Sequence, residues 1–135
     1  MIPLIFGKTK SSAILLFLIV LDQASKSLAE QTIPVVCNRG SAFGLPIGNV
    51  YVSAGLLSIV AFIFLKNRKS GYNLPLALIL GGGFSNFIDR IFKGCVVDFI
   101  DFKLWPSFNL ADGAITIGAV ILALNLLRTS EDHGF

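Results

Sequence analysis

The sequence of 135 residues contains few charged side chains, two cysteines and one histidine. Charged residues make up 14% of the chain, hydrophobic residues make up 54%, and the mean hydropathy is +0.78. A soluble domain of this size could not remove so much apolar surface from water. The composition therefore predicts an integral membrane protein, with residues 1–135 forming a single domain.

These scarcities also exclude several kinds of site. The single histidine, His133, lies near the C-terminus and outside any apolar segment, which argues against a Ser-His-Asp triad, a Cys-His pair or a membrane zinc site. Cys37 and Cys95 are far apart and form no C-x-x-C motif. The net charge of +3 is small, and the basic residues lie in short clusters in the expected loops. We therefore expect no metal, no cofactor and no nucleic-acid partner.

Four apolar segments are candidates for membrane-spanning helices, which need roughly 20 mostly apolar residues. They cover about residues 11–29, 50–65, 74–92 and 110–127. Residues 32–48 and 94–102, which lie between spans, are rich in β-branched residues and glycine and predict short strands. The expected fold class is an all-α membrane protein with four transmembrane helices and a small extracytoplasmic β element. Three successive glycines, Gly81 to Gly83, indicate a close helix-packing surface, because they lack the lysine of a P-loop.

Lysine and arginine residues set the expected orientation, because they are enriched in cytoplasmic loops. The basic residues assigned to the cytoplasmic side are Lys8, Lys10, Lys66, Arg68, Lys69 and Arg128. Both termini should then be cytoplasmic, and the two longer loops should be outside. A cleavable secretory signal remains the alternative for the first span.

Polar residues gather near the outer end of the expected bundle. They are Asp22 and Lys26 in the first span, Asn86, Asp89 and Arg90 in the third, Asp98 before the fourth, and Asn109 and Asp112 at its start. Charges inside a membrane are costly, so they tend to be paired or functional. We interpret Asp22, Lys26 and Asp89 as structural, with Asp22 pairing with Lys26 and Asp89 pairing with Arg90 or a neighbouring helix.

Asp98 and Asp112 then remain without an obvious cation. Two carboxyl groups that share a small site cannot both ionise easily, so one of them holds a proton. Such a pair can activate water with one member and protonate a carbonyl oxygen with the other. The same charges would also suit a small proton-coupled transporter. A Ser-Lys hydrolase that uses Lys26 is a third possibility.

Five blocks of the sequence resemble those of the lipoprotein signal peptidase family, also called signal peptidase II. The blocks are LDQASK at 21–26, NRGSAFG at 38–44, GGGFSNFIDR at 81–90, VVDFIDF at 96–102 and FNLADGA at 108–114. The resemblance implies a four-span aspartic endopeptidase of the bacterial inner membrane, with its active site at the periplasmic face. Its implied substrate is a prolipoprotein modified with diacylglycerol, cut just before the lipidated cysteine. It also implies contact with membrane lipid and inhibition by globomycin, and we expect a monomer.

The resemblance places the catalytic aspartates at Asp98 and Asp112. It places substrate-binding residues at Asn38, Asn86, Arg90 and Asn109, and it leaves Asp22 and Lys26 with a structural role. Arg39 and Ser41 stand where the family usually has small neutral residues, which affects the expected substrate preference. The two cysteines are not part of the family pattern. A disulfide between them is permitted outside the cytoplasm, but two free thiols are the simpler expectation.

The two aspartates are expected to differ in charge. Asp112 lies in the first turn of a helix, where the partial positive charge favours a carboxylate. Asp98 lies in a strand-like segment without that help. We therefore expect Asp98 to hold the shared proton, although the titration belongs to the pair.

Overall fold

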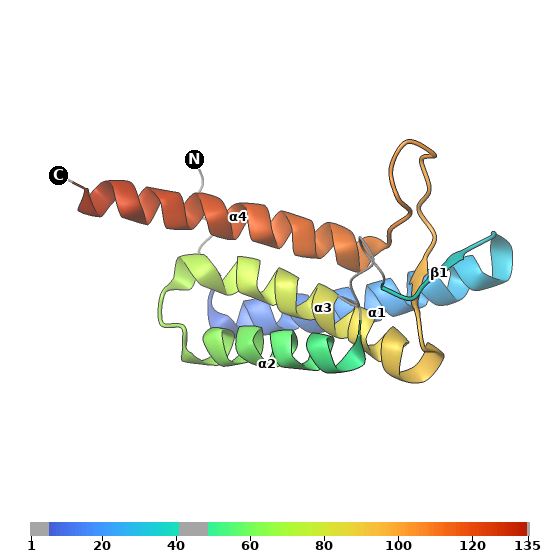
Figure 1. Ribbon diagram of the computed structural model, residues 1–135. Helices are drawn as coiled ribbons and strands as arrows, with labels where there is room; N and C mark the ends of the chain where they lie inside the picture. The colour runs from blue at the N-terminus through green and yellow to red at the C-terminus, as the bar shows by residue number, and fades with distance from the viewer. Residues whose placement is uncertain (1–5, 41–48, 135) are drawn as a thin grey trace.

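The computed structural model describes residues 6–40 and 49–134. In chain order its elements are α1 (Lys8–Thr32), β1 (Val36–Asn38), α2 (Val50–Lys66), the 3-10 helix η1 (Ser70–Tyr72), α3 (Asn73–Lys93), β2 (Val96–Asp98) and α4 (Leu110–His133). Each of the four expected spans lies within one of the α-helices (Figure 1). The expected fold class, a helical membrane protein with a small sheet, is confirmed.

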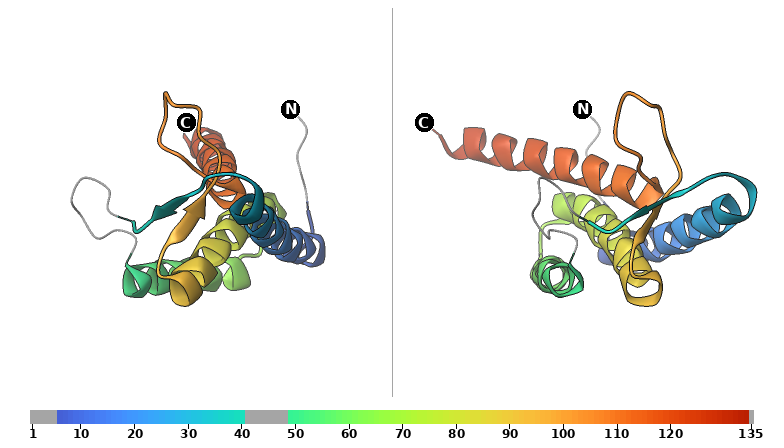
Figure 2. Two further views of the ribbon diagram at one scale, coloured as in Figure 1. Left: turned by 90° about the vertical axis from the view of Figure 1, so that its right-hand side faces the viewer. Right: turned by 45° about the vertical axis from the view of Figure 1, so that its right-hand side comes forward.

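Helix α3 is the central helix of the bundle and packs against α1, α2 and α4 (Figure 2). Its three glycines make these contacts possible. A Cβ atom added to Gly81 would lie 3.1 Å from the carbonyl oxygen of Leu15 on α1. One added to Gly82 would lie 2.5 Å from the carbonyl oxygen of Ala111 on α4, and one added to Gly83 would lie 2.8 Å from a side chain of α2. The expected glycine packing surface therefore faces three helices at once.

Replacing Gly82 by alanine is expected to destabilise the protein by about 1–3 kcal/mol, because the new methyl group would push α3 and α4 apart. The measurement is thermal unfolding of the purified protein in detergent. Gly55→Ala on α2 is the matched control, since nothing lies within 4 Å of a Cβ atom at that position. Equal unfolding temperatures for the two variants would contradict this account of the α3–α4 contact.

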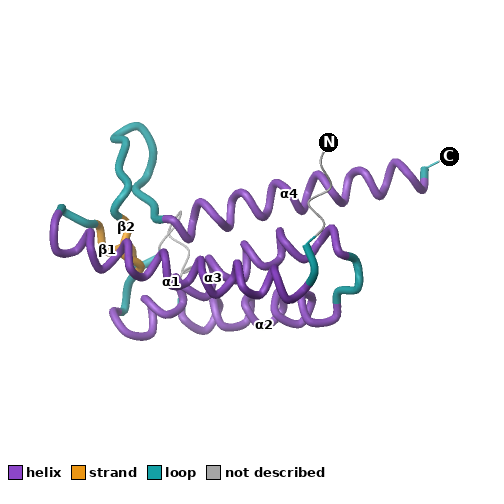
Figure 3. Tube along the Cα trace, turned by 180° about the vertical axis from the view of Figure 1, so that it is seen from behind, coloured by secondary structure: helices purple, strands orange, loops and turns teal. Residues whose placement is uncertain are grey.

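The two strands lie together at one end of the bundle. Gly94 ends α3 in a left-handed conformation with φ of 72°, which suits glycine, and the chain then turns into β2. β1 and β2 are antiparallel, with Val36 opposite Asp98, Cys37 opposite Val97 and Asn38 opposite Val96. Figure 3 shows this sheet at the end of the bundle opposite the C-terminal end of α4.

A loop of residues 99–109 connects β2 to α4 and stands away from the helices (Figure 1). Its two arms are joined by hydrogen bonds from the Ile100 nitrogen to the Phe108 oxygen, 2.9 Å, and from the Phe108 nitrogen to the Ile100 oxygen, 3.0 Å. This closure brings the start of α4 back beside the end of β2.

Length and composition bear on the membrane-spanning prediction. Among the described residues, α1 and α4 are long and apolar enough to cross a bilayer, and α2 is a shorter apolar helix. Large apolar side chains such as Phe17, Ile59 and Val120 are more than half exposed on their outer faces. Such surfaces suit contact with lipid rather than water.

Candidate active site

Asp98 and Asp112 come from the two elements that the 99–109 loop brings together. Asp98 is the last residue of β2 and is 1% exposed, whereas Asp112 lies half-buried in the first turn of α4. Asn109 is the N-cap residue of that helix: its side-chain oxygen accepts a hydrogen bond from the Asp112 nitrogen, 2.9 Å. The Asp112 carboxyl in turn accepts a hydrogen bond of 3.3 Å from the backbone nitrogen of Asn109, which completes a capping box. The position of Asp112 is thus fixed by the start of the helix.

Two asparagine side chains link the two carboxyl groups. The Asn109 amide donates to Asp98 Oδ1 at 2.9 Å, and the Asn86 amide donates to Asp112 Oδ1 at 2.9 Å. The Asn109 amide also donates to the Asn86 oxygen at 3.1 Å. A continuous hydrogen-bonded chain therefore runs from Asp98 to Asp112 across β2, α4 and α3.

The environment of Asp98 favours its protonated form. Burial, with a contribution from the Asp112 charge, raises the pKa of Asp98 to about 6. Hydrogen bonds from the amides of Asn38, at 3.1 Å, and of Asn109 oppose that rise in pKa. At a given pH near neutrality Asp98 is therefore protonated more often than an exposed aspartate would be.

Lys26 is the centre of a fully buried ionic cluster beneath the two carboxyl groups. Its ammonium lies 2.6 Å from Asp22 Oδ2, 2.9 Å from Asp89 Oδ2 and 3.0 Å from the Asn86 oxygen. The structure thus contains the expected pair of Asp22 with Lys26. Asp89 pairs with Lys26 of the neighbouring helix α1.

The two carboxylates of this cluster also hold the backbone next to the candidate catalytic residues. Asp22 accepts a hydrogen bond of 2.9 Å from the nitrogen of Ala111, the residue before Asp112. Asp89 accepts one of 3.0 Å from the nitrogen of Val97, the residue before Asp98. Sequence reasoning did not identify this arrangement, because hydrogen bonds to backbone nitrogen leave no mark on the sequence.

Gln23 supports the same cluster and is a second residue that sequence reasoning missed. Its side-chain nitrogen donates at 3.0 Å to the carbonyl and hydroxyl oxygens of Ser85 and to Asp89. The Ser85 hydroxyl donates to Asp22 at 2.6 Å. Gln23 lies within the 21–26 block, so its place in that block was the available signal.

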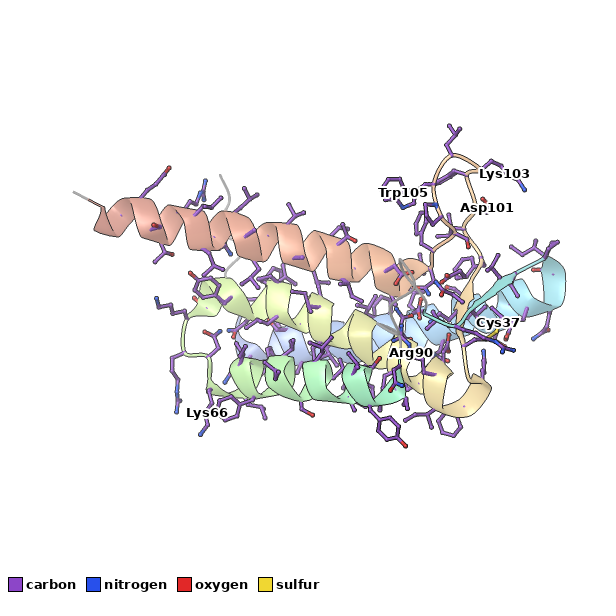
Figure 4. All side chains as sticks on the ribbon, viewed as in Figure 1. Cys37, Lys66, Arg90, Asp101, Lys103 and Trp105 are labelled. Atoms are coloured by element: carbon purple, nitrogen blue, oxygen red, sulfur yellow. A yellow bond between two sulfur atoms is a disulfide. The ribbon has the colours of Figure 1, made fainter. Side chains whose placement is uncertain are left out.

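Arg90 lies at the same end of the bundle, as Figure 4 shows. Its guanidinium charge attracts the carboxyl groups of Asp112, Asp89 and Asp98. Its buried Nε has no hydrogen-bond partner among the described residues. Asn38, in contrast, is exposed and reaches the site from β1.

Cys37 and Cys95 form a disulfide, so the expectation of two free thiols is wrong. The physical reason is the pairing of β1 with β2, which brings residues 58 apart in sequence to a Cα–Cα distance of 5.4 Å. The available signal was that each cysteine adjoins a strand-like segment on the same side. Of the two residues that depart from the family pattern, Arg39 is exposed and Ser41 lies outside the described residues.

Known proteins resemble the chain over most of its length. Residues 14–128 match the family described as Signal peptidase (SPase) II. A lipoprotein signal peptidase of Halothermothrix orenii is 39% identical, with 87% of this chain and 95% of that protein covered. One of Moorella thermoacetica is 37% identical, with 88% and 93% covered. A bacterial membrane enzyme solved by the in meso method at 2.3 Å superposes with a TM-score of 0.81 and 26% identity, covering 93% of this chain and 92% of that one.

Proposed function

The chain belongs to the signal peptidase II family, and we propose that Asp98 and Asp112 are its catalytic pair. It is a bacterial membrane enzyme, a lipoprotein signal peptidase that removes signal peptides from prolipoproteins. The observation that carries the proposed pair is the asparagine-linked chain of hydrogen bonds between one buried and one half-buried carboxyl group.

In the proposed reaction Asp112 is the general base. Its carboxyl group lies at the start of α4 and accepts hydrogen bonds from the backbone nitrogen of Asn109 and from the Asn86 amide. It takes a proton from a water molecule, and the oxygen of that water attacks the scissile carbonyl carbon. Asp98 donates its proton to the carbonyl oxygen as negative charge develops there. The proton held by Asp112 then passes to the leaving amine, and Asp98 recovers its own as the carbonyl re-forms.

The proposed substrate-binding residues are Asn38, Asn86, Arg90 and Asn109. Arg90 is the strongest of these, because a buried guanidinium nitrogen that has no partner within residues 6–40 and 49–134 can donate to a substrate carbonyl. Asn86 and Asn109 donate hydrogen bonds to the two carboxyl groups and so orient them for the substrate. Asp22, Lys26 and Asp89 are proposed to be structural.

The topology and the details of the substrate are also proposals. The bundle is proposed to lie in the inner membrane as one monomeric domain with both termini cytoplasmic, as the basic residues indicate. The sheet end, with the catalytic pair, then lies at the periplasmic face. The proposed substrate carries diacylglycerol on the cysteine that follows the cleaved bond, and globomycin is proposed to inhibit the enzyme. Membrane lipid is the remaining partner.

Cleavage of a purified prolipoprotein in detergent tests this function. The precursor modified with diacylglycerol is expected to be cut immediately before its lipidated cysteine. The same polypeptide without the lipid is expected to stay intact over the same time. Mass spectrometry of the products identifies the cut bond. Equal cleavage of the two precursors, or a cut elsewhere, would contradict the proposed substrate.

A further inference from the structure

We infer that the Cys37–Cys95 disulfide is a positioning group, which holds β1 over Asp98 and keeps that carboxyl group out of water. The inference rests on the proposed function, because it concerns the proposed general acid. The disulfide joins the middle residue of β1 to the residue immediately before β2. Neither cysteine belongs to the five sequence blocks described above.

Without the disulfide, only weak interactions would hold β1 against β2. It has only three residues and all of them are exposed, whereas all three residues of β2 are buried. A two-stranded ladder of this length is marginally stable in water. An exposed strand is also the kind of segment that opens locally. Within the described residues, the covalent bond to Cys95 is therefore the strongest constraint that keeps β1 on β2.

The two faces of this small sheet make different contacts. Successive side chains of a strand point to opposite faces, so Val36 and Asn38 share one face of β1 and Cys37 lies on the other. Val36 is directly opposite Asp98, and Asn38 donates to the Asp98 carboxyl at 3.1 Å. The disulfide thus fastens one face while the other face covers the carboxyl group. Figure 4 shows Cys37 on β1 at the sheet end of the bundle.

The charges around Asp98 come from the three helices and not from β1. They are Lys26 on α1, Asp89 and Arg90 on α3, and Asp112 on α4. β1 contributes cover and the Asn38 amide, and the exposed Arg39 follows it. Burial is the largest cause of the raised pKa of Asp98. Opening of β1 would admit water and lower that pKa, so that Asp98 would lose its proton at a lower pH.

Reduction of the purified full-length enzyme tests the inference. Dithiothreitol gives two electrons and two protons to the disulfide, which becomes two thiols, and is itself oxidised to its cyclic disulfide. The measurement is kcat/KM for the lipid-modified precursor across pH 5 to 8, before and after reduction. Reduction is expected to move the alkaline limb to lower pH by about half a unit or more, which is a loss of about threefold at pH 7. The oxidised Asn38→Leu variant keeps β1 over Asp98 but loses the hydrogen bond from the Asn38 amide, which lowers the pKa of Asp98. The alkaline limb of its pH profile should therefore move to higher pH.

Two further measurements separate this role from a purely structural one. The double variant Cys37→Ala with Cys95→Ala should show the shifted profile without reductant and should not respond to it. Hydrogen exchange at residues 36–38 should become faster on reduction while exchange in α3 and α4 is unchanged. The inference would be overturned if reduction left the alkaline limb of the pH profile unshifted. It would also be overturned if residues 36–38 were equally protected from hydrogen exchange before and after reduction. An oxidised enzyme that does not cleave would overturn the proposed function instead, and hydrogen exchange would still decide whether the disulfide holds β1.

Discussion

Replacing either Asp98 or Asp112 by asparagine is expected to lower cleavage of the lipid-modified precursor by at least about a thousandfold. A carboxamide has nearly the shape of a carboxyl group, but it cannot accept a proton from water or donate one as an acid. The two variants should be inactive at every pH from 5 to 8. Both should still be purified from the membrane as folded protein, because the buried Lys26 cluster is untouched.

The matched control for these variants is Asp101→Asn in the 99–109 loop. Asp101 is exposed and accepts a hydrogen bond from the Lys103 nitrogen at 2.8 Å, and it is not part of the asparagine-linked chain. Its replacement is expected to leave kcat/KM within about threefold of the wild-type value. Initial rates with thermal unfolding measured on the same samples separate lost chemistry from lost folding. Wild-type turnover by Asp98→Asn or Asp112→Asn would end the two-carboxylate mechanism.

Asp98 and Asp112 have different surroundings. Asp98 is buried with a pKa of about 6, and it lies next to the charge of Asp112. Asp112 lies in a capping box and accepts hydrogen bonds from the backbone nitrogen of Asn109 and from the Asn86 amide. The sequence predicts that Asp98, which ends a strand, holds the shared proton. The environment of Asp98 agrees with that expectation.

The local features of this protein could be predicted because local sequence determines them. Long apolar runs located the four helices, and β-branched segments located the two strands. The three-residue spacing of Asn109 and Asp112 placed both at one helix start. Family resemblance added the identity of the candidate site residues, which spacing alone could not have supplied.

The features that were missed depend on long-range packing. The disulfide needs β1 and β2 to pair across 58 residues, and no local pattern encodes that pairing. The sequence left the partner of Asp89 open between Arg90 and a neighbouring helix, and the packing of α1 against α3 decides it in favour of Lys26. The hydrogen bonds from Ala111 to Asp22 and from Val97 to Asp89 depend on the approach of four different elements, α4 to α1 and β2 to α3. Each of these is a relation between segments rather than a property of one segment.

Replacing Lys26 by methionine is expected to destabilise the folded protein by about 3–5 kcal/mol, because it leaves the buried carboxylates of Asp22 and Asp89 without their shared cation. Activity should fall together with stability. The same carboxylates bind the backbone beside Asp98 and Asp112, so their displacement would move both catalytic groups. Thermal unfolding in detergent and initial cleavage rates are the two measurements.

Lys93→Met is the matched control for this prediction, because Lys93 also joins α1 to α3. Its ammonium lies 3.1 Å from Glu30, but both side chains are about one-third exposed, so the pair is worth only about 0–1 kcal/mol. Adding Asp22→Asn and Asp89→Asn to Lys26→Met removes the uncompensated charges and should restore part of the lost stability. If Lys26→Met were no less stable than Lys93→Met, the cluster could not be what holds the two catalytic segments in place. In that case the asparagine-linked chain alone would have to position the carboxyl groups.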